Sequence, residues 1–262
     1  MDAAQPSFAH PSFAATGDGQ RIAYERTEGG HPVLLVHGFA TTGALTWEAT
    51  GWVRALAEDG RGAIVVDLRG HGQSSGPHDG GAYSPTILAG DLLAVLDTEG
   101  LEQVDVIGYS MGSYAALALA QTAPQRVRRL VVGGIGTEEQ FARWGVDVVR
   151  SALLQPGDTW ADVADSPIGP LLASLRQAPG LDREALAACV TGMAAHPLDL
   201  SSPVPTLLVV GEADPVTQGR DEAAQKLGAE LVVIPKRNHV TTLSARAFKQ
   251  AALPFLERAS TS

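Results

Sequence analysis

The stretch Val104-Asp105-Val106-Ile107-Gly108-Tyr109-Ser110-Met111-Gly112 decides the fold that the sequence predicts. Residues 104–107 form an apolar run typical of a buried strand, and the small residues at 113–120 are typical of a helix. A serine on such a tight strand-to-helix turn can hold its hydroxyl clear of the backbone, and the flanking glycines leave room where strand and helix nearly touch. We therefore interpret Ser110 as a candidate nucleophile; the alternative is a plain turn that carries a serine.

Short apolar runs alternate with helical patterns on both sides of this stretch. Runs that are apolar on both faces suit central strands of a parallel sheet, and they lie at residues 32–36, 63–66, 104–107, 130–132, 206–210 and 231–234. Helix candidates lie near residues 45–59, 84–99, 111–123, 216–227 and 241–257. Two strand-like pieces at 12–16 and 21–26 flank a turn signal and predict a hairpin. The sequence therefore predicts an α/β fold whose mostly parallel central sheet, of about eight strands, is flanked by helices.

Residues 137–202 break this alternation because they contain no good strand. They hold helical patterns near 138–154 and 183–193, separated by prolines and glycines. A helical, apolar-rich insertion between two strands is typical of a lid over the sheet edge. The alternative is a disordered linker, which the aromatic side chains of Phe141 and Trp144 argue against. We therefore predict a core at residues 12–136 and 203–258, with a helical lid at 137–202.

Composition excludes several classes of function. The formal net charge is −10 and no dense cluster of lysine and arginine occurs, which argues against a nucleic-acid partner. We find neither a leader pattern nor an apolar window long enough to span a membrane, so we expect a cytoplasmic protein without a membrane partner. The single cysteine, Cys189, cannot form an internal disulfide. No metal-ligand spacing and no dinucleotide or phosphate-loop fingerprint occurs, so we expect no metal and no cofactor.

Polar groups follow the predicted strands where a parallel α/β sheet builds its sites. They are His37-Gly38-Phe39, Asp67-Leu68-Arg69-Gly70-His71-Gly72-Gln73-Ser74, Gly211-Glu212-Ala213-Asp214 and Asn238-His239. A serine hydroxyl needs a base, an imidazole with its ordinary pKa of ~6.5 suits that task, and a carboxylate fixes the imidazole's tautomer. Strand ends thus supply Ser, Asp and His in that order. His37 is a rival base and Glu212 a rival acid.

With these motifs and the pentapeptide around Ser110, the chain resembles the α/β-hydrolase superfamily, specifically esterase-like serine hydrolases with a small helical lid. The resemblance runs from about residue 21 to about residue 256. It implies that Ser110 is the nucleophile, Asp214 the acid and His239 the base. It also implies an oxyanion hole made by the backbone N–H groups of Phe39 and Met111.

The resemblance implies cleavage of a carboxylic ester or lactone of a small to medium apolar substrate through an acyl-enzyme on Ser110. The same triad could instead serve C–C bond hydrolysis, enol-lactone hydrolysis, metal-free perhydrolysis or cyclisation in secondary metabolism. A non-enzymatic small-molecule receptor on the same fold is a further alternative. Candidate substrate-binding residues are Phe39, Tyr109, Phe141 and Trp144.

Overall fold

The computed structural model describes residues 11–154 and 181–258, and the strands of this part form one eight-stranded sheet in the order β1-β2-β4-β3-β5-β6-β7-β8. The hairpin of β1 and β2 lies at one edge, where β2 pairs antiparallel with β4, and the strands β3 to β8 run parallel to one another. The bounds are β1 (Ser12–Ala15), β2 (Arg21–Arg26), β3 (Gly30–Val36), β4 (Arg61–Val66), β5 (Val104–Tyr109), β6 (Val127–Gly133), β7 (Thr206–Gly211) and β8 (Glu230–Ile234). The predicted fold class and strand number are confirmed.

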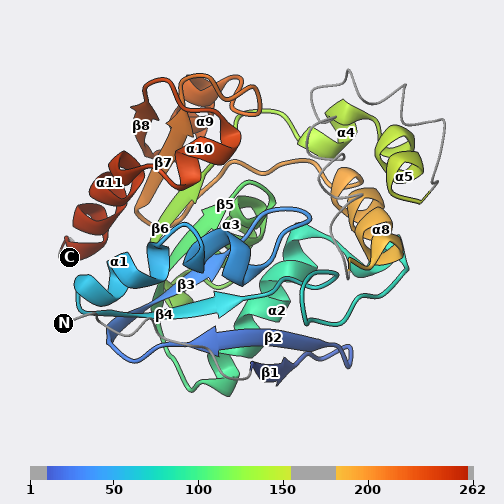
Figure 1. Cartoon of the computed structure of the whole chain (residues 1–262), viewed down its shortest axis with the longest axis horizontal. Coiled ribbons are helices and arrows are strands. Elements are labelled where there is room, and N and C mark those ends of the chain that lie inside the picture. Colours follow the sequence, from blue (N-terminus) through green and yellow to red (C-terminus); the bar gives the residue numbers. More distant parts are fainter. Residues whose placement is uncertain (1–10, 155–180, 259–262) are drawn as a thin grey trace.

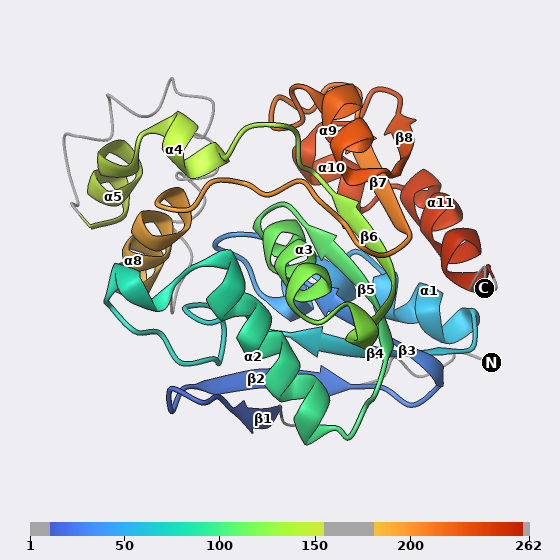
Figure 2. The same cartoon turned by 180° about the vertical axis from the view of Figure 1, so that it is seen from behind.

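Helices cover both faces of the sheet because side chains alternate between the faces along each strand. Leu34 and Val36 of β3 belong to one buried cluster, to which α2 (Pro85–Thr98), α3 (Met111–Thr122) and α9 (Arg220–Leu227) also contribute side chains. Val33 and Leu35 pack into the opposite layer, with α1 (Trp52–Glu58) and α11 (Arg246–Glu257). Figure 1 shows α1 and α11 near one another, and Figure 2 shows α2 beside α3. Burial on both faces explains why the central strands are apolar throughout.

Two of the helices predicted for the core are interrupted. The helix expected over 45–59 divides into η1 (Ala44–Glu48) and α1 because Gly51 adopts a left-handed conformation with φ 75°. The helix expected over 241–257 divides into α10 (His239–Leu243) and α11 because Ala245 is extended. The second break places His239 at the start of a short helix of its own.

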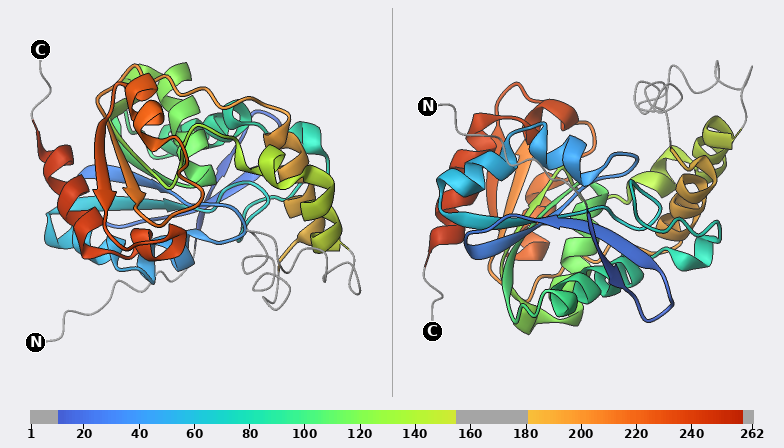
Figure 3. Two further views of the ribbon diagram at one scale, coloured as in Figure 1. Left: turned by 90° about the horizontal axis from the view of Figure 1, so that it is seen from above. Right: turned by 60° about the horizontal axis from the view of Figure 1, so that its bottom comes forward.

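Three described helices lie between β6 and β7: α4 (Gln140–Trp144), α5 (Val146–Leu154) and α8 (Arg183–Ala194). They gather at one end of the molecule, far from α11 (Figure 1, Figure 3). The Arg150 side chain on α5 donates a 2.6 Å hydrogen bond to the Thr191 hydroxyl on α8. Residues 155–180 of the predicted lid lie outside the described residues, and the lid and its boundaries stay predictions.

Short 3-10 turns complete the described chain: η2 (Gly80–Ala82) and η3 (Pro124–Arg126). In the part of the chain that the structure describes, no helix is both long and apolar enough to cross a membrane.

Candidate active site

Ser110 lies on a strained turn between β5 and α3. Its φ of 54° and ψ of −124° are uncommon for a residue with a side chain, and such strain gathers at functional sites. The turn is held by the Ser110 N–H, which donates to the Gly133 carbonyl at 2.8 Å. A Cβ atom at Gly112 would lie 2.2 Å from the Val36 carbonyl oxygen, so only glycine fits beside the end of β3.

The first turn of α3 places backbone N–H groups next to this serine. Ser110 is the N-cap residue, and its side chain makes no capping hydrogen bond. The first N–H groups of a helix have no intrahelical partner, and the helix dipole favours negative charge at this end. The N–H of Met111, the first residue of α3, is therefore suited to an oxyanion.

Asp214 and His239 meet although they follow different strands. His239 Nδ1 lies 2.9 Å from Asp214 Oδ2, and the carboxylate side chain has no solvent exposure. The other carboxylate oxygen accepts the Val216 N–H at 2.9 Å. The position of His239 is set by Asn238, whose side chain caps α10. The imidazole keeps 29% of its surface exposed, so one side of the buried pair can reach a substrate.

The loop after β3 approaches Ser110 from the other side. A Cβ atom at Gly38 would lie 3.7 Å from the Ser110 hydroxyl oxygen, so Gly38 lies against the serine, and Phe39 is the next residue along the chain. Within the described residues, no hydrogen bond joins the Ser110 hydroxyl to the His239 imidazole, so their pairing stays a prediction. Such hydrogen bonds are often long in enzymes without substrate and shorten when it binds.

Three of the candidate substrate-binding residues form a row of aromatic rings. Phe39 packs edge to face on Phe141 with 4.9 Å between ring centroids, and Phe141 packs on Trp144 at 5.7 Å. The row connects the loop after β3 to α4. The fourth candidate, Tyr109, lies instead beside the His239 imidazole, with 5.2 Å between centroids. Their contacts with substrate stay predictions.

His37 is unsuited to the role of base. It is fully buried, its Nδ1–H donates to the Gly38 carbonyl at 2.7 Å, and its Nε2 accepts the Leu68 N–H at 2.9 Å. Burial lowers the pKa of His37 to about 4, and burial with the neighbouring His37 ring lowers that of His71 to about 3. Both rings are therefore neutral near pH 7 and shape the loop that carries Phe39.

The rival acid, Glu212, points elsewhere. It is exposed, and its carboxylate accepts the Lys236 N–H at 2.9 Å.

Cys189 is fully buried beside Met111, with 3.7 Å between the two sulfur atoms, and burial raises the pKa of its thiol. That thiol is unsuited to nucleophilic attack. Among residues 11–154 and 181–258, no group of three or more His, Cys, Asp or Glu side chains could hold a metal ion.

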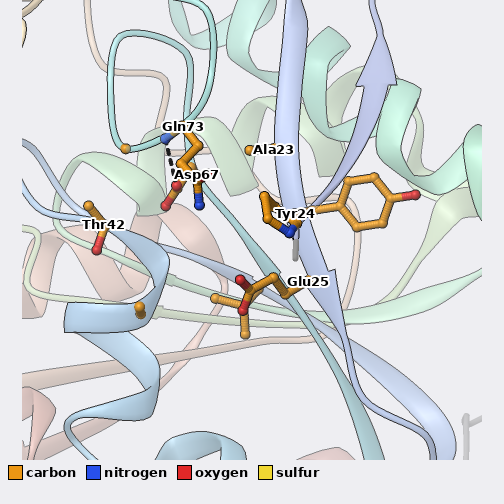
Figure 4. A pocket seen from close by; sticks show the side chains of 10 residues that line it. Ala23, Tyr24, Glu25, Thr42, Asp67 and Gln73 are labelled. Atoms are coloured by element: carbon orange, nitrogen blue, oxygen red, sulfur yellow. Dashed lines mark hydrogen bonds between the residues drawn. The ribbon is translucent and has the colours of Figure 1, made fainter. Parts of the chain in front are cut away.

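The turn after β4 holds the loop after β3 through hydrogen bonds. The Asp67 carboxylate accepts the N–H groups of Gly43 at 2.8 Å and Gln73 at 2.9 Å. Figure 4 shows Asp67, Gln73 and Glu25 at a cavity of about 140 Å³, whose lining contains none of the three predicted catalytic residues. Burial and the charges of Glu48 and Asp67 raise the pKa of Glu25 to about 7. This cavity is therefore separate from the candidate active site.

One contact beside the site was not predicted from the sequence. The Tyr109 hydroxyl donates a hydrogen bond to the backbone carbonyl of His239. The two residues are 130 positions apart, and no periodicity or motif signals such a contact. The sequence signal for this contact is the Gly133-Gly134 pair, because side chains at these two positions would overlap the Tyr109 ring.

Comparisons with known proteins agree with the fold. The family model for the alpha/beta hydrolase fold matches residues 31–165, about half of the chain. The chain is 35% identical over 122 residues to a 2-hydroxymuconate semialdehyde hydrolase from Pseudomonas sp. strain CF600, covering 44% of this chain and 42% of that protein. The chain thus spans less than half the length of this curated relative.

Two solved structures are similar over almost the whole chain. A hydrolase from Pseudomonas aeruginosa PA01 has a TM-score of 0.78 and 28% identity, covering 96% of this chain and all of that one. A thermophilic esterase from Thermogutta terrifontis has a TM-score of 0.76 and 26% identity, covering 95% of this chain and 98% of that one.

Proposed function

Because the chain belongs to the α/β-hydrolase fold family, we propose that it is a serine hydrolase that cleaves a carboxylic ester or lactone of a small to medium apolar substrate. The observation that carries the proposal is the buried Asp214 carboxylate 2.9 Å from His239 Nδ1, on the same sheet edge as the strained Ser110 turn. The similarity to an esterase structure at 26% identity supports the ester class.

The proposed reaction has two halves. The Ser110 oxygen attacks the substrate carbonyl carbon while His239 Nε2 takes the hydroxyl proton, and Asp214 stabilises the imidazolium that forms. The carbonyl electrons move onto oxygen, where the N–H groups of Met111 and Phe39 donate to the oxyanion. Its collapse breaks the ester C–O bond, and the alcohol leaves with the proton from His239. Water then attacks the acyl-enzyme with His239 as base and releases the acid.

The aromatic row of Phe39, Phe141 and Trp144 supports an apolar acyl or alcohol group. It begins at the loop that carries an oxyanion donor, so a carbonyl bound at Ser110 would place its substituent near these rings. Phe39 and Phe141 are buried, which provides a water-poor wall on which apolar groups bind favourably.

Replacement of Ser110 tests the proposal. We expect Ser110→Ala to reduce hydrolysis of nitrophenyl esters by ~10⁴-fold or more, because it removes the hydroxyl on which the acyl-enzyme forms. The control is Ser244→Ala, which removes an exposed hydroxyl. A phosphonate ester should add covalently to the unsubstituted protein and not to Ser110→Ala, as intact mass would show. Undiminished ester turnover by Ser110→Ala would remove the proposal.

A second candidate, C–C bond hydrolysis, is favoured by one observation. The relative that is 35% identical over 122 residues bears the name 2-hydroxymuconate semialdehyde hydrolase. Both reactions need the same serine, so Ser110→Ala does not separate them. Comparison of kcat/KM for 2-hydroxymuconate semialdehyde with that for butyrate and hexanoate esters does, and we expect the esters to be preferred by about tenfold or more.

A further inference from the structure

The Tyr109 side chain joins the turn that carries Ser110 to the segment that carries His239. It is the last residue of β5 and precedes Ser110 in the chain, whereas His239 begins α10 after β8. The Tyr109 hydroxyl donates to the His239 carbonyl oxygen, and the Tyr109 ring lies beside the imidazole at a centroid distance of 5.2 Å and a 42° angle. One side chain thus contacts both the backbone and the ring of the candidate base.

The end of β6 leaves a path for this side chain. β6 lies between β5 and β7, and Gly133 is the register partner of Tyr109. A Cβ atom at Gly133 would lie 2.8 Å from Tyr109 Cδ2, and one at Gly134 would lie 2.9 Å from Tyr109 Cζ. The tyrosine ring therefore crosses the sheet edge over two residues without side chains. The Cβ position at Gly134 is also 2.9 Å from His239 Cε1, so the imidazole packs against this glycine too.

The Tyr109 ring also packs against α11. Phe248 on α11 lies 6.1 Å from it between centroids, and Tyr109 is only 4% exposed. Burial raises the pKa of the Tyr109 hydroxyl well above its ordinary value, so the group stays a hydrogen-bond donor throughout the pH range of an assay.

We propose that Tyr109 is a positioning residue: it holds the backbone and ring of His239 in register with the serine turn that directly follows Tyr109. This inference deepens the proposed function and rests on it. Asp214 fixes one edge of the imidazole through Nδ1. The hydroxyl of Tyr109 fixes the main chain that carries the imidazole, and both contacts are needed to define where Nε2 points. A displacement of about 1 Å at such a group can reduce a rate by as much as ~100-fold.

Tyr109→Phe tests this directly because it keeps the ring and removes only the hydroxyl. We expect kcat for a nitrophenyl ester to fall about tenfold while KM changes less than about twofold, because positioning of the base acts on the chemical step. The matched control is Tyr83→Phe. Tyr83 is 1% exposed and donates a 2.7 Å hydrogen bond to the Pro77 carbonyl, so it loses the same kind of buried hydrogen bond. We expect it to lower Tm to a similar extent and to leave kcat unchanged.

A second measurement does not depend on catalysis. The Cε1–H proton resonance of His239, assigned by its loss in His239→Gln, should shift or broaden in Tyr109→Phe and stay in place in Tyr83→Phe. If Ser110→Ala retains full activity, the proposed function fails, and this resonance still decides the role of Tyr109. An unchanged resonance together with an unchanged kcat in Tyr109→Phe would overturn the inference. A loss of kcat of equal size in Tyr83→Phe would overturn it too.

Discussion

Replacement of the buried carboxylate by its isosteric amide, Asp214→Asn, is the sharpest test of the catalytic geometry. Its oxygen Oδ1 accepts the Val216 N–H at 2.9 Å, and Oδ2 faces His239 Nδ1 at 2.9 Å. The amide oxygen can keep the Val216 hydrogen bond. The amide NH₂ then faces Nδ1, which must become an acceptor, so the imidazole proton moves to Nε2.

An imidazole protonated at Nε2 cannot accept the Ser110 proton. Because the Asp214 side chain has no solvent exposure, no water can take over the acceptor position. The corresponding change in a well-studied serine protease reduces kcat by ~10⁴-fold, and we expect a loss of that size here, about 5 kcal/mol of transition-state stabilisation. KM should change little, since neither group binds the ground-state substrate.

The assay is hydrolysis of nitrophenyl butyrate by purified variants that show the same far-ultraviolet circular dichroism as the unsubstituted protein. Glu212→Gln is the matched control, because it neutralises a carboxylate two residues away that is exposed and bonded to the Lys236 N–H. We expect the control to keep its kcat within about twofold, in keeping with a surface charge outside the site. Retention of more than about a tenth of kcat by Asp214→Asn would refute the reasoning.

Two further predictions concern stability. The pKa of Glu25 is raised from 4.5 to about 7, so the folded state binds more protons between these values, and the free energy of unfolding should fall as pH rises from about 4.5 to about 7. Glu25→Gln should reduce this fall by about 1 kcal/mol, allowing for the partial exposure of the carboxylate. The measurement is urea unfolding at several pH values, and the prediction is contradicted if the unfolding free energy of the variant changes with pH as steeply as that of the unsubstituted protein. Arg69→Ala should lower the free energy of unfolding by about 3–5 kcal/mol, because it leaves Asp91 buried without the guanidinium 2.6 Å away. Urea denaturation measures this, and a loss below about 1 kcal/mol would show that Asp91 finds another partner.

The strands were predictable because their signal is local. A run such as residues 206–210 is apolar on both faces, and that pattern suits a strand covered by helices. The glycines around Ser110 were interpretable for a similar reason, since a tight turn places strict demands on adjacent residues. The helix breaks at Gly51 and Ala245 were not predicted, because the apolar spacing continues across both and the conformation of single residues decides where a helix ends.

The candidate site shows the same division. Asp214 and His239 were predicted as members of one site because parallel strands deliver their following loops to one edge of a sheet, and their contact at 2.9 Å agrees with that topology. The sequence alone left His37 open as a rival base. Its exclusion needs the positions of the Gly38 carbonyl and the Leu68 N–H, which engage both ring nitrogens.

The sequence by itself determined the order of strands and helices, the serine turn and the residues at the strand ends, since these depend on periodicity and on the conformations that glycine allows. Only the tertiary structure decided which side chains touch: Tyr109 with His239, Arg69 with Asp91, and Phe39 with Phe141. The physical reason is that such contacts join residues far apart in the chain, where burial and hydrogen bonding depend on how the whole sheet and its loops pack.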